Sequence, residues 1–210
     1  MARETQILRN IVFSIFNGKS NGVLIECGAL NGIYLSVGYE LSSLLQWKCF
    51  NVEANLKSYQ ELVKNRPESI NLHYALSATD NETVLISNAK KKKLCRIVDD
   101  ETRQHFKVQT ITYKTLITDN KINKVDLLIL DIEGYEGFAI RGMQNCEVLP
   151  DVICLESRSL NELNNNLNYL ECLSESYKVV GKVKHNYFFF KESLDLIFPM
   201  KKAMFSLKRD

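Results

Sequence analysis

Residues 125–136 read Val-Asp-Leu-Leu-Ile-Leu-Asp-Ile-Glu-Gly-Tyr-Glu, and this stretch decides the fold. Residues 127–130 are all apolar, which is typical of a strand buried on both faces at the centre of a parallel sheet. From Asp131 onward, three carboxylates follow within six residues. Ligands of such sheets bind beyond the carboxyl ends of the strands. The stretch therefore predicts the centre of a sheet and part of its binding edge.

Strand and helix patterns alternate on both sides of this stretch. Apolar runs predict strands at 23–27, 48–53, 70–76, 83–87, 125–131 and 152–156, another within 106–116, and a closing hairpin of 177–183 and 187–191. Helical spacing of apolar residues predicts helices at 4–16, 31–45, 56–64, 138–143 and 160–174. This order predicts an α/β fold, namely a doubly wound, mainly parallel sheet with a C-terminal antiparallel hairpin.

The composition fits one folded domain. Of 210 residues, 45% are hydrophobic and 25% are charged, both near the averages for globular proteins. No repeat and no Pro/Gly/Ser-rich linker divides the chain. We therefore expect a single domain over 1–210, with an N-terminal helix at about 4–16 and a basic, apolar tail at about 195–210.

Composition also argues against several classes of protein. The net charge of +2 does not predict a nucleic-acid-binding surface. The amino terminus lacks a signal-peptide pattern, and no apolar run is long enough to cross a bilayer.

The six cysteines include no C-x-x-C pair, so no zinc site is expected. Cys27, Cys49 and Cys154 lie in apolar runs and are expected in the core. A cytoplasmic protein with reduced thiols is the simplest expectation.

The first strand runs into the turn Glu26-Cys-Gly-Ala-Leu-Asn-Gly32. Its glycine spacing is G-x-x-x-G, whereas dinucleotide-binding turns have G-x-G-x-x-G, which argues against a nicotinamide oxidoreductase. The turn suits a ligand without phosphate, such as S-adenosylmethionine, whose amino-acid end can lie against it. An ordinary strand–helix turn has the same pattern. The candidate cofactor contacts here are Glu26, Gly28, Ala29, Asn31 and Gly32.

Two further strand ends offer cofactor contacts. Glu53 and Ala54 follow the second strand, where a carboxylate can accept hydrogen bonds from both hydroxyls of a ribose. Asn55 is better placed than Glu53 to cap the next helix, which frees Glu53 for a ligand. Leu76 and Ser77 end the third strand and can border an adenine ring, although a polar turn explains them equally well.

The acidic segment supplies the catalytic candidates, Asp131, Glu133 and Glu136. Crowded carboxylates raise one another's pKa values unless a cation or donor relieves them. Asp131 or Glu133 can serve as the base that takes a proton from a hydroxyl, or both can hold Mg²⁺ or Ca²⁺. We favour a site without metal, in which Asp131 also borders the cofactor. Of the histidines, His73 is expected to be structural and His185 to lie exposed at the hairpin turn.

Four blocks of the sequence resemble the FkbM-type methyltransferase family. They are Ile25–Gly32, Val52–Asn55, Ala75–Ser77, and Leu128–Glu136 followed by Arg141-Gly142. Leu155-Glu156 is similar to the family's acidic end of the next strand, so the resemblance spans about residues 23–156. Three positions depart from the family pattern: Glu26 stands where Asp is usual, and Leu30 and Ala54 replace the usual Asn and Pro.

The resemblance implies a Rossmann-like class I methyltransferase that uses S-adenosylmethionine. Such enzymes typically methylate hydroxyls of sugars or natural products, so we expect O-methylation of a glycan or small-molecule acceptor. Two alternatives stay open. The departures at Leu30 and Ala54 would suit a methyltransferase-like binding module without catalysis. RNA 2′-O-methylation would use Lys19, Asp131 and Glu156, but it needs a second lysine between the two acids, and none is there.

Several features do not follow from the sequence. The acceptor and the oligomeric state have no transferable code. Residues 88–104 suit either a surface loop or a lid over the substrate. The tail at 195–210, where basic residues alternate with apolar ones, suits a solvated end, a partner contact or an acidic membrane surface.

Overall fold

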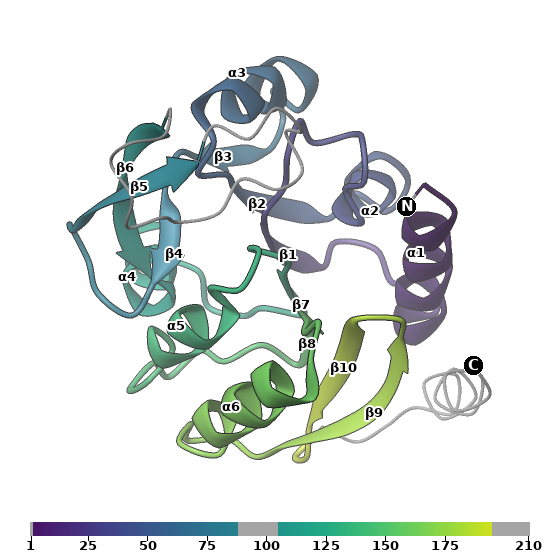
Figure 1. Ribbon diagram of the computed structural model, residues 1–210. Coiled ribbons are helices and arrows are strands. Elements are labelled where there is room, and N and C mark those ends of the chain that lie inside the picture. The colour runs from purple at the N-terminus through teal and green to yellow at the C-terminus, as the bar shows by residue number, and fades with distance from the viewer. Residues whose placement is uncertain (1, 88–104, 195–210) are drawn as a thin grey trace.

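A seven-stranded sheet forms the centre of the computed structural model, which describes residues 2–87 and 105–194 (Figure 1). The strand order is β3-β2-β1-β7-β8-β10-β9. Pairing is parallel from β3 to β8 and antiparallel for β10 and β9. The strands are β1 (Val23–Cys27), β2 (Lys48–Val52), β3 (Ile70–Leu72), β7 (Leu127–Leu130), β8 (Val152–Glu156), β9 (Tyr177–Val183) and β10 (Asn186–Lys191). The predicted parallel sheet with a closing hairpin is confirmed.

Helices cover both faces of the sheet. α1 (Ala2–Phe16) and α2 (Gly38–Leu45) pack on one face, and α4 (Tyr113–Asp119), α5 (Glu136–Arg141) and α6 (Leu160–Leu170) on the other. Figure 1 shows α1 on the opposite side of the sheet from α4 and α5. α3 (Leu56–Asn65) packs beside β3 at the sheet margin. This layering is the doubly wound arrangement that the alternating pattern predicts.

β7 occupies the centre of the sheet, as its composition predicts. All four of its residues are buried, and it pairs with β1 on one side and β8 on the other. The thiols of Cys27, Cys49 and Cys154 are free and buried in the two cores, also as predicted. Across 2–87 and 105–194, no helix combines the length and apolarity needed to span a membrane.

The helix predicted over 31–45 is wrong in its first half, because α2 begins only at Gly38. Leu30, Gly32 and Leu35 have φ values of 50°, 77° and 61°, and such left-handed positions cannot continue a right-handed helix. The Asn31 side chain accepts hydrogen bonds from the backbone N–H groups of the two residues after Gly32. Residues 31–37 therefore form a loop between the glycine turn and α2.

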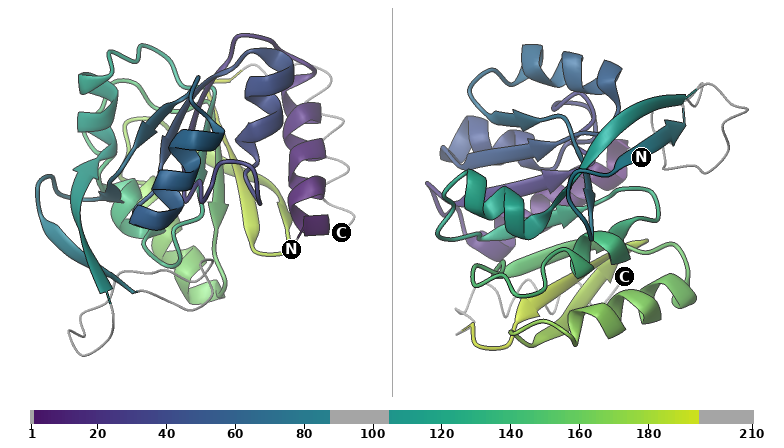
Figure 2. Two further views of the ribbon diagram at one scale, coloured as in Figure 1. Left: turned by 90° about the horizontal axis from the view of Figure 1, so that it is seen from above. Right: turned by 90° about the vertical axis from the view of Figure 1, so that its left-hand side faces the viewer.

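The strand predicted over 70–76 is two strands in different sheets. β3 ends at Leu72, and β4 (Ala75–Ser77) joins β6 (His105–Thr112) and β5 (Thr83–Ser87) in a second sheet. Figure 2 shows β5 and β6 extending beyond the main sheet. His73 lies at the break, where its Nε2 is 3.1 Å from the Ala54 oxygen and its ring stacks on Tyr59. These contacts confirm its predicted structural role.

Two other boundaries differ from prediction. The apolar run over 106–116 contains β6 and then the start of α4, a helix that the sequence did not predict. Thr112 begins it, because its hydroxyl accepts from the Thr115 N–H and Asp80 accepts from the Thr112 N–H. α6 ends at Leu170, four residues before the predicted boundary. Turns closed by hydrogen bonds between residues i and i+3 follow it. Segments 88–104 and 195–210, to which a lid and a docking tail were assigned as options, lie outside the described residues.

Candidate active site at the carboxyl edge of the sheet

Four neighbouring strands place the predicted site residues along one edge. β2, β1, β7 and β8 are adjacent and parallel, so Glu53, Gly28, Asp131 and Glu156 stand at the same edge in that order. Parallel strands lie about 4.8 Å apart, so these four span about 14 Å. The edge can thus contact an elongated ligand at several separate points.

Gly28 is required by the close approach of β1 and β7. Its φ is 84°, and a Cβ at this position would collide with the backbone oxygen of Asp131. Its N–H donates to the Val52 oxygen at 3.0 Å, and the Asp131 N–H donates to the Cys27 oxygen at 3.2 Å. The glycine turn therefore brings the ends of β2, β1 and β7 together.

Packing against the protein interior fixes the rest of the turn, at Ala29 and Gly32. Ala29 is buried, and a Cβ on Gly32 would collide with Leu62 and with the buried Arg66 side chain. The Arg66 guanidinium also donates to the Gly32 oxygen at 3.1 Å. Internal packing thus explains these two positions, and any cofactor contact there would involve the backbone.

Glu26 and Arg9 hold the loop that follows the turn. Glu26 is buried, and its carboxylate accepts from the Ser36 hydroxyl at 2.7 Å and from the N–H groups of Val37 and Gly38 at 2.7 and 3.2 Å. Arg9 of α1 donates to the Ser36 oxygen. Glu26 was predicted as a cofactor contact, and the structure directs its side chain beneath the start of α2.

Glu53 links the turn after β1 to the turn after β2. Its Oε2 accepts from the Leu30 N–H at 2.8 Å and its Oε1 from the Asn55 N–H at 2.7 Å. Burial raises the pKa of Glu53 to about 7, although these hydrogen bonds oppose the rise. Asn55 caps α3 through the N–H groups of Lys57 and Ser58, as predicted. Glu53 is therefore not consumed by helix capping.

The residues predicted to border an adenine ring lie in the second sheet and not in the main one. Leu76 and Ser77 belong to β4, and both are buried. Leu76 lies in the larger core, and a Cβ on Gly142 would collide with the Ser77 backbone oxygen. Ala54 is half-buried beside them, against the small core that includes Ala75. Of these predicted contacts, Ala54 is the one whose side chain keeps some exposure.

Glu136 shapes the acidic loop from beneath. It is buried, and its Oε1 accepts from the N–H groups of Ile132 and Gly134 at 2.9 and 3.3 Å. Burial raises its pKa to about 7 against the effect of those bonds. The loop above it contains two left-handed residues, Glu133 and Gly134, with φ values of 60° and 99°. Glu136, predicted as catalytic, is placed as a support for that loop.

Asp131 combines exposure with a strongly perturbed environment. The surrounding protein, and then the carboxylates of Glu156 and Glu133, raise its pKa well above the ordinary value. Its side chain is nevertheless exposed to solvent. Because exposure limits desolvation, we attribute much of the rise to the neighbouring carboxylates.

Arg158 is a site residue that the sequence reading missed. Its Nη2 lies 2.7 Å from Glu133 Oε2 and 3.1 Å from Glu156 Oε2, so it bridges the β7 loop and the end of β8. The sequence offered one signal for Arg158, namely its position two residues after Glu156 at the predicted strand end. In the described part of the chain, no group of three or more His, Cys, Asp or Glu residues is arranged for a metal ion.

Of two other basic candidates, Lys19 lies at the opposite edge of the sheet, whereas His185 lies at this edge, where its backbone oxygen accepts from the Ser157 N–H at 2.7 Å. Lys19 pairs with Asp126, which lies just before β7 at the opposite edge of the sheet and also accepts from the Val23 N–H. Lys19 therefore cannot join Asp131 and Glu156, and the RNA methyltransferase arrangement is not formed. His185 is exposed at the turn between β9 and β10, as predicted.

The buried carboxyls predict how stability depends on pH. Glu53 and Glu136 have pKa values of about 7, against 4.5 for an ordinary glutamate. Because folding raises these values, the stabilisation is fully present below pH 4.5 and is lost as pH rises through 7. Each group can contribute on the order of 3 kcal/mol.

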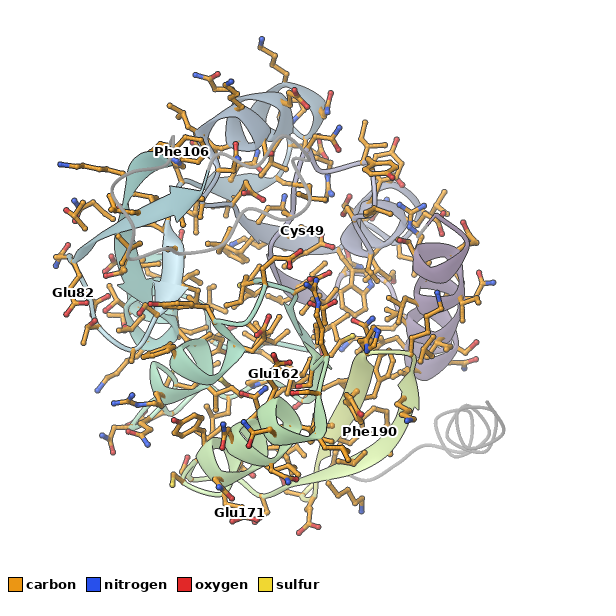
Figure 3. All side chains as sticks on the ribbon, viewed as in Figure 1. Cys49, Glu82, Phe106, Glu162, Glu171 and Phe190 are labelled. Atoms are coloured by element: carbon orange, nitrogen blue, oxygen red, sulfur yellow. The ribbon has the colours of Figure 1, made fainter. Side chains whose placement is uncertain are left out.

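We therefore expect the thermal unfolding midpoint to fall between about pH 5 and about pH 8. Glu136→Gln should flatten this slope. Glu82→Gln is the matched control, because Glu82 is exposed at the margin of the molecule (Figure 3). A midpoint that rises over this range would show that other groups dominate the linkage.

Three solved structures are similar to this chain. The chain is 16% identical to the methyltransferase FkbM from Methylobacillus flagellatus KT, covering 81% of this chain and 43% of that one with a TM-score of 0.49. It is 14% identical to a Pyrococcus furiosus methyltransferase, covering 90% and 83% with a TM-score of 0.49. It is 10% identical to a METTL16 methyltransferase domain, covering 89% of this chain and 66% of that one with a TM-score of 0.50. Such identities bear on the fold alone.

The family comparison reaches further than the structural ones. No curated protein matches the chain. A family model, the methyltransferase FkbM domain, matches residues 26–177, which is more than two thirds of the chain. That range contains the glycine turn, Glu53, the acidic loop and Arg158. The chain therefore belongs to the FkbM methyltransferase family and uses S-adenosylmethionine as its cofactor.

Proposed function

We propose that this methyltransferase transfers the methyl group to a hydroxyl of a sugar or small metabolite. The observation that carries the proposal is Asp131, an exposed carboxyl with a raised pKa at the edge where the cofactor turn and the acidic loop meet. A hydroxyl acceptor must lose a proton as it is methylated, and a carboxyl with a raised pKa is a stronger proton acceptor than an ordinary one.

The residues present suit S-adenosylmethionine. Glu53 offers carboxylate oxygens to sugar hydroxyls at the end of β2. Among the described residues, Arg158 is the cation that bridges Glu133 and Glu156, and Asp131 adds a third acid beside them, so the β7–β8 end complements a positively charged ligand. We assign Glu53, Ala54 and the backbone of Gly28–Gly32 to cofactor binding. When bound, the cofactor supplies an activated methyl group on a sulfonium.

The other residues then have distinct tasks. Asp131 accepts the acceptor's hydroxyl proton, and its exposure leaves it accessible to an acceptor. Glu136 fixes the loop on which Glu133 stands. Glu26 fixes the loop after the glycine turn. In this assignment only Asp131 and Glu133 are catalytic candidates, and Glu26 and Glu136 position the backbone.

The test is a methylation assay with isotopically labelled S-adenosylmethionine and panels of sugars, polyols, carboxylic acids and amines. We expect an O-methyl ether as product, identified by NMR of the methyl carbon. An N-methyl product or a methyl ester would overturn the hydroxyl assignment.

A second candidate is the binding module without catalysis, which the departures at Leu30 and Ala54 favour. Calorimetry with S-adenosylmethionine and S-adenosylhomocysteine separates the two cases. We expect both to bind. No binding would favour a non-enzymatic protein, and binding without turnover across the acceptor panels would leave the cofactor assignment intact and count against catalysis.

A further inference from the structure

We propose that Arg158 is the positioning residue that keeps Glu133 and Glu156 ionised, so that Asp131 is the carboxyl that exchanges a proton with the acceptor. This inference rests on the proposed function of Asp131. It assigns the proton to one of three neighbouring carboxyls, and it gives a role to a residue outside the acidic loop itself.

The geometry shows one guanidinium nitrogen shared between two carboxylates. Arg158 Nη2 lies 2.7 Å from Glu133 Oε2, 3.1 Å from Glu156 Oε2 and 3.3 Å from Glu156 Oε1. The two glutamate side chains are only 14% and 12% exposed, whereas that of Arg158 is 44% exposed. Charge-assisted bonds of this kind favour the ionised carboxylate.

Asp131 has no such cation in direct contact among the described residues. The groups that face it are Glu156 at the end of β8, Glu133 and Glu136 on its own loop and on α5, and the more distant Arg158. Within the sheet it also faces the buried Cys154 thiol. A hydrogen bond with Glu156 favours the protonated form of Asp131, which is the arrangement expected when Glu156 is ionised. Of the three carboxylates, Asp131 therefore has the highest affinity for a proton, and its ionised form is the one that takes the proton from the acceptor.

The Arg158 side chain can be separated from the local fold. Helix α6 is capped by the Ser159 hydroxyl, which accepts from the Glu162 N–H, and Glu162 accepts from the backbone N–H of Arg158. Neither bond uses the guanidinium. Replacing only the side chain should thus leave the start of α6 in place, and an effect on the carboxyls can be read without unfolding.

The experiment is a carboxyl ¹³C NMR titration of the full chain without cofactor. Wild type, Arg158→Met and Arg158→Lys are compared, and Asp131→Asn, Glu133→Gln and Glu156→Gln assign the signals. In wild type, we expect the Asp131 signal to titrate at higher pH than the Glu133 and Glu156 signals. In Arg158→Met, the two glutamate signals should move to higher pH by at least about one unit, and Arg158→Lys should restore part of the difference.

Arg141→Met is the control, because Arg141 lies over the Phe138 and Tyr169 rings and, within the part of the chain that the structure describes, forms no ion pair with these acids. Glutamate signals that titrate alike in wild type and Arg158→Met, in protein with an unchanged thermal midpoint, would overturn the inference. The proposed function fails separately, if both Asp131→Asn and Glu133→Gln retain full methyl transfer. If Arg158→Met unfolds the protein, Arg158→Gln takes its place, because it removes the charge but keeps a polar side chain. Glutamate signals at higher pH than in Arg141→Met then support the inference, and identical glutamate signals in the two variants overturn it.

Discussion

Asp131→Asn should lower the rate of methyl transfer by about 10²–10⁴-fold, the usual contribution of a general base. The amide keeps the size of the carboxyl but cannot accept the hydroxyl proton. Asp131 is exposed at the site edge, and its backbone N–H, which bonds Cys27, is unchanged by the substitution. The fold and the affinity for S-adenosylhomocysteine should therefore stay within a few-fold of wild type.

The measurement uses labelled S-adenosylmethionine and the acceptor that the wild-type protein methylates, with cofactor-product affinity measured by calorimetry. Asp119→Asn is the matched control, because Asp119 is exposed at the end of α4, which leads to the start of β7, whereas Asp131 follows the end of that strand. Glu133→Gln is measured beside it, since Glu133 is the other candidate base. Unchanged turnover in both Asp131→Asn and Glu133→Gln would remove the assignment.

The pattern of the sequence was sufficient for the sheet, because burial on both faces leaves a direct record in composition. All four residues of β7 are apolar and buried, and the strand ends at the acid that the pattern marks as the binding edge. Neighbouring strand ends follow from the same rule. Asn55, a residue with strong capping preference directly before an amphipathic run, caps α3 as expected.

The structure departs from the sequence-based predictions where side chains form hydrogen bonds with the backbone or with distant side chains. Helical spacing over 31–45 is real, but left-handed residues and the Glu26 bonds to Val37 and Gly38 delay the helix to Gly38. Glu136 resembles a catalytic acid in sequence and serves its own loop in space. Arg158 was missed because its partners come from two strand ends, and such pairing has no periodic signature.

Glu53→Gln should weaken the binding of S-adenosylhomocysteine by about 10- to 100-fold. A hydrogen bond from a ligand hydroxyl to a carboxylate contributes about 1.5–3 kcal/mol, against about 0.5–1.5 kcal/mol for a neutral acceptor, and 1.4 kcal/mol is tenfold in affinity. Glutamine keeps one oxygen for the Leu30 N–H, but its amide then faces the Asn55 N–H, a donor that needs an acceptor. Some loss of stability is expected as well.

The pH dependence of binding separates the lost charge from a disturbed turn. The pKa of Glu53 is about 7, so in wild type its carboxylate fraction grows as pH rises through that value, and calorimetry should show tighter binding at about pH 8 than at about pH 6. Glu53→Gln has no group to titrate there and should show a flat profile, whereas Glu82→Gln should follow wild type. A Glu53→Gln protein that binds as tightly as wild type, or that keeps the wild-type pH profile, would mean that another group holds the cofactor's hydroxyls. If Glu53→Gln binds more weakly and with a flat pH profile, the ionised Glu53 itself makes the contact with the cofactor. A displaced turn alone would lower the affinity equally at both pH values, and the pH dependence that other groups give to wild type would persist.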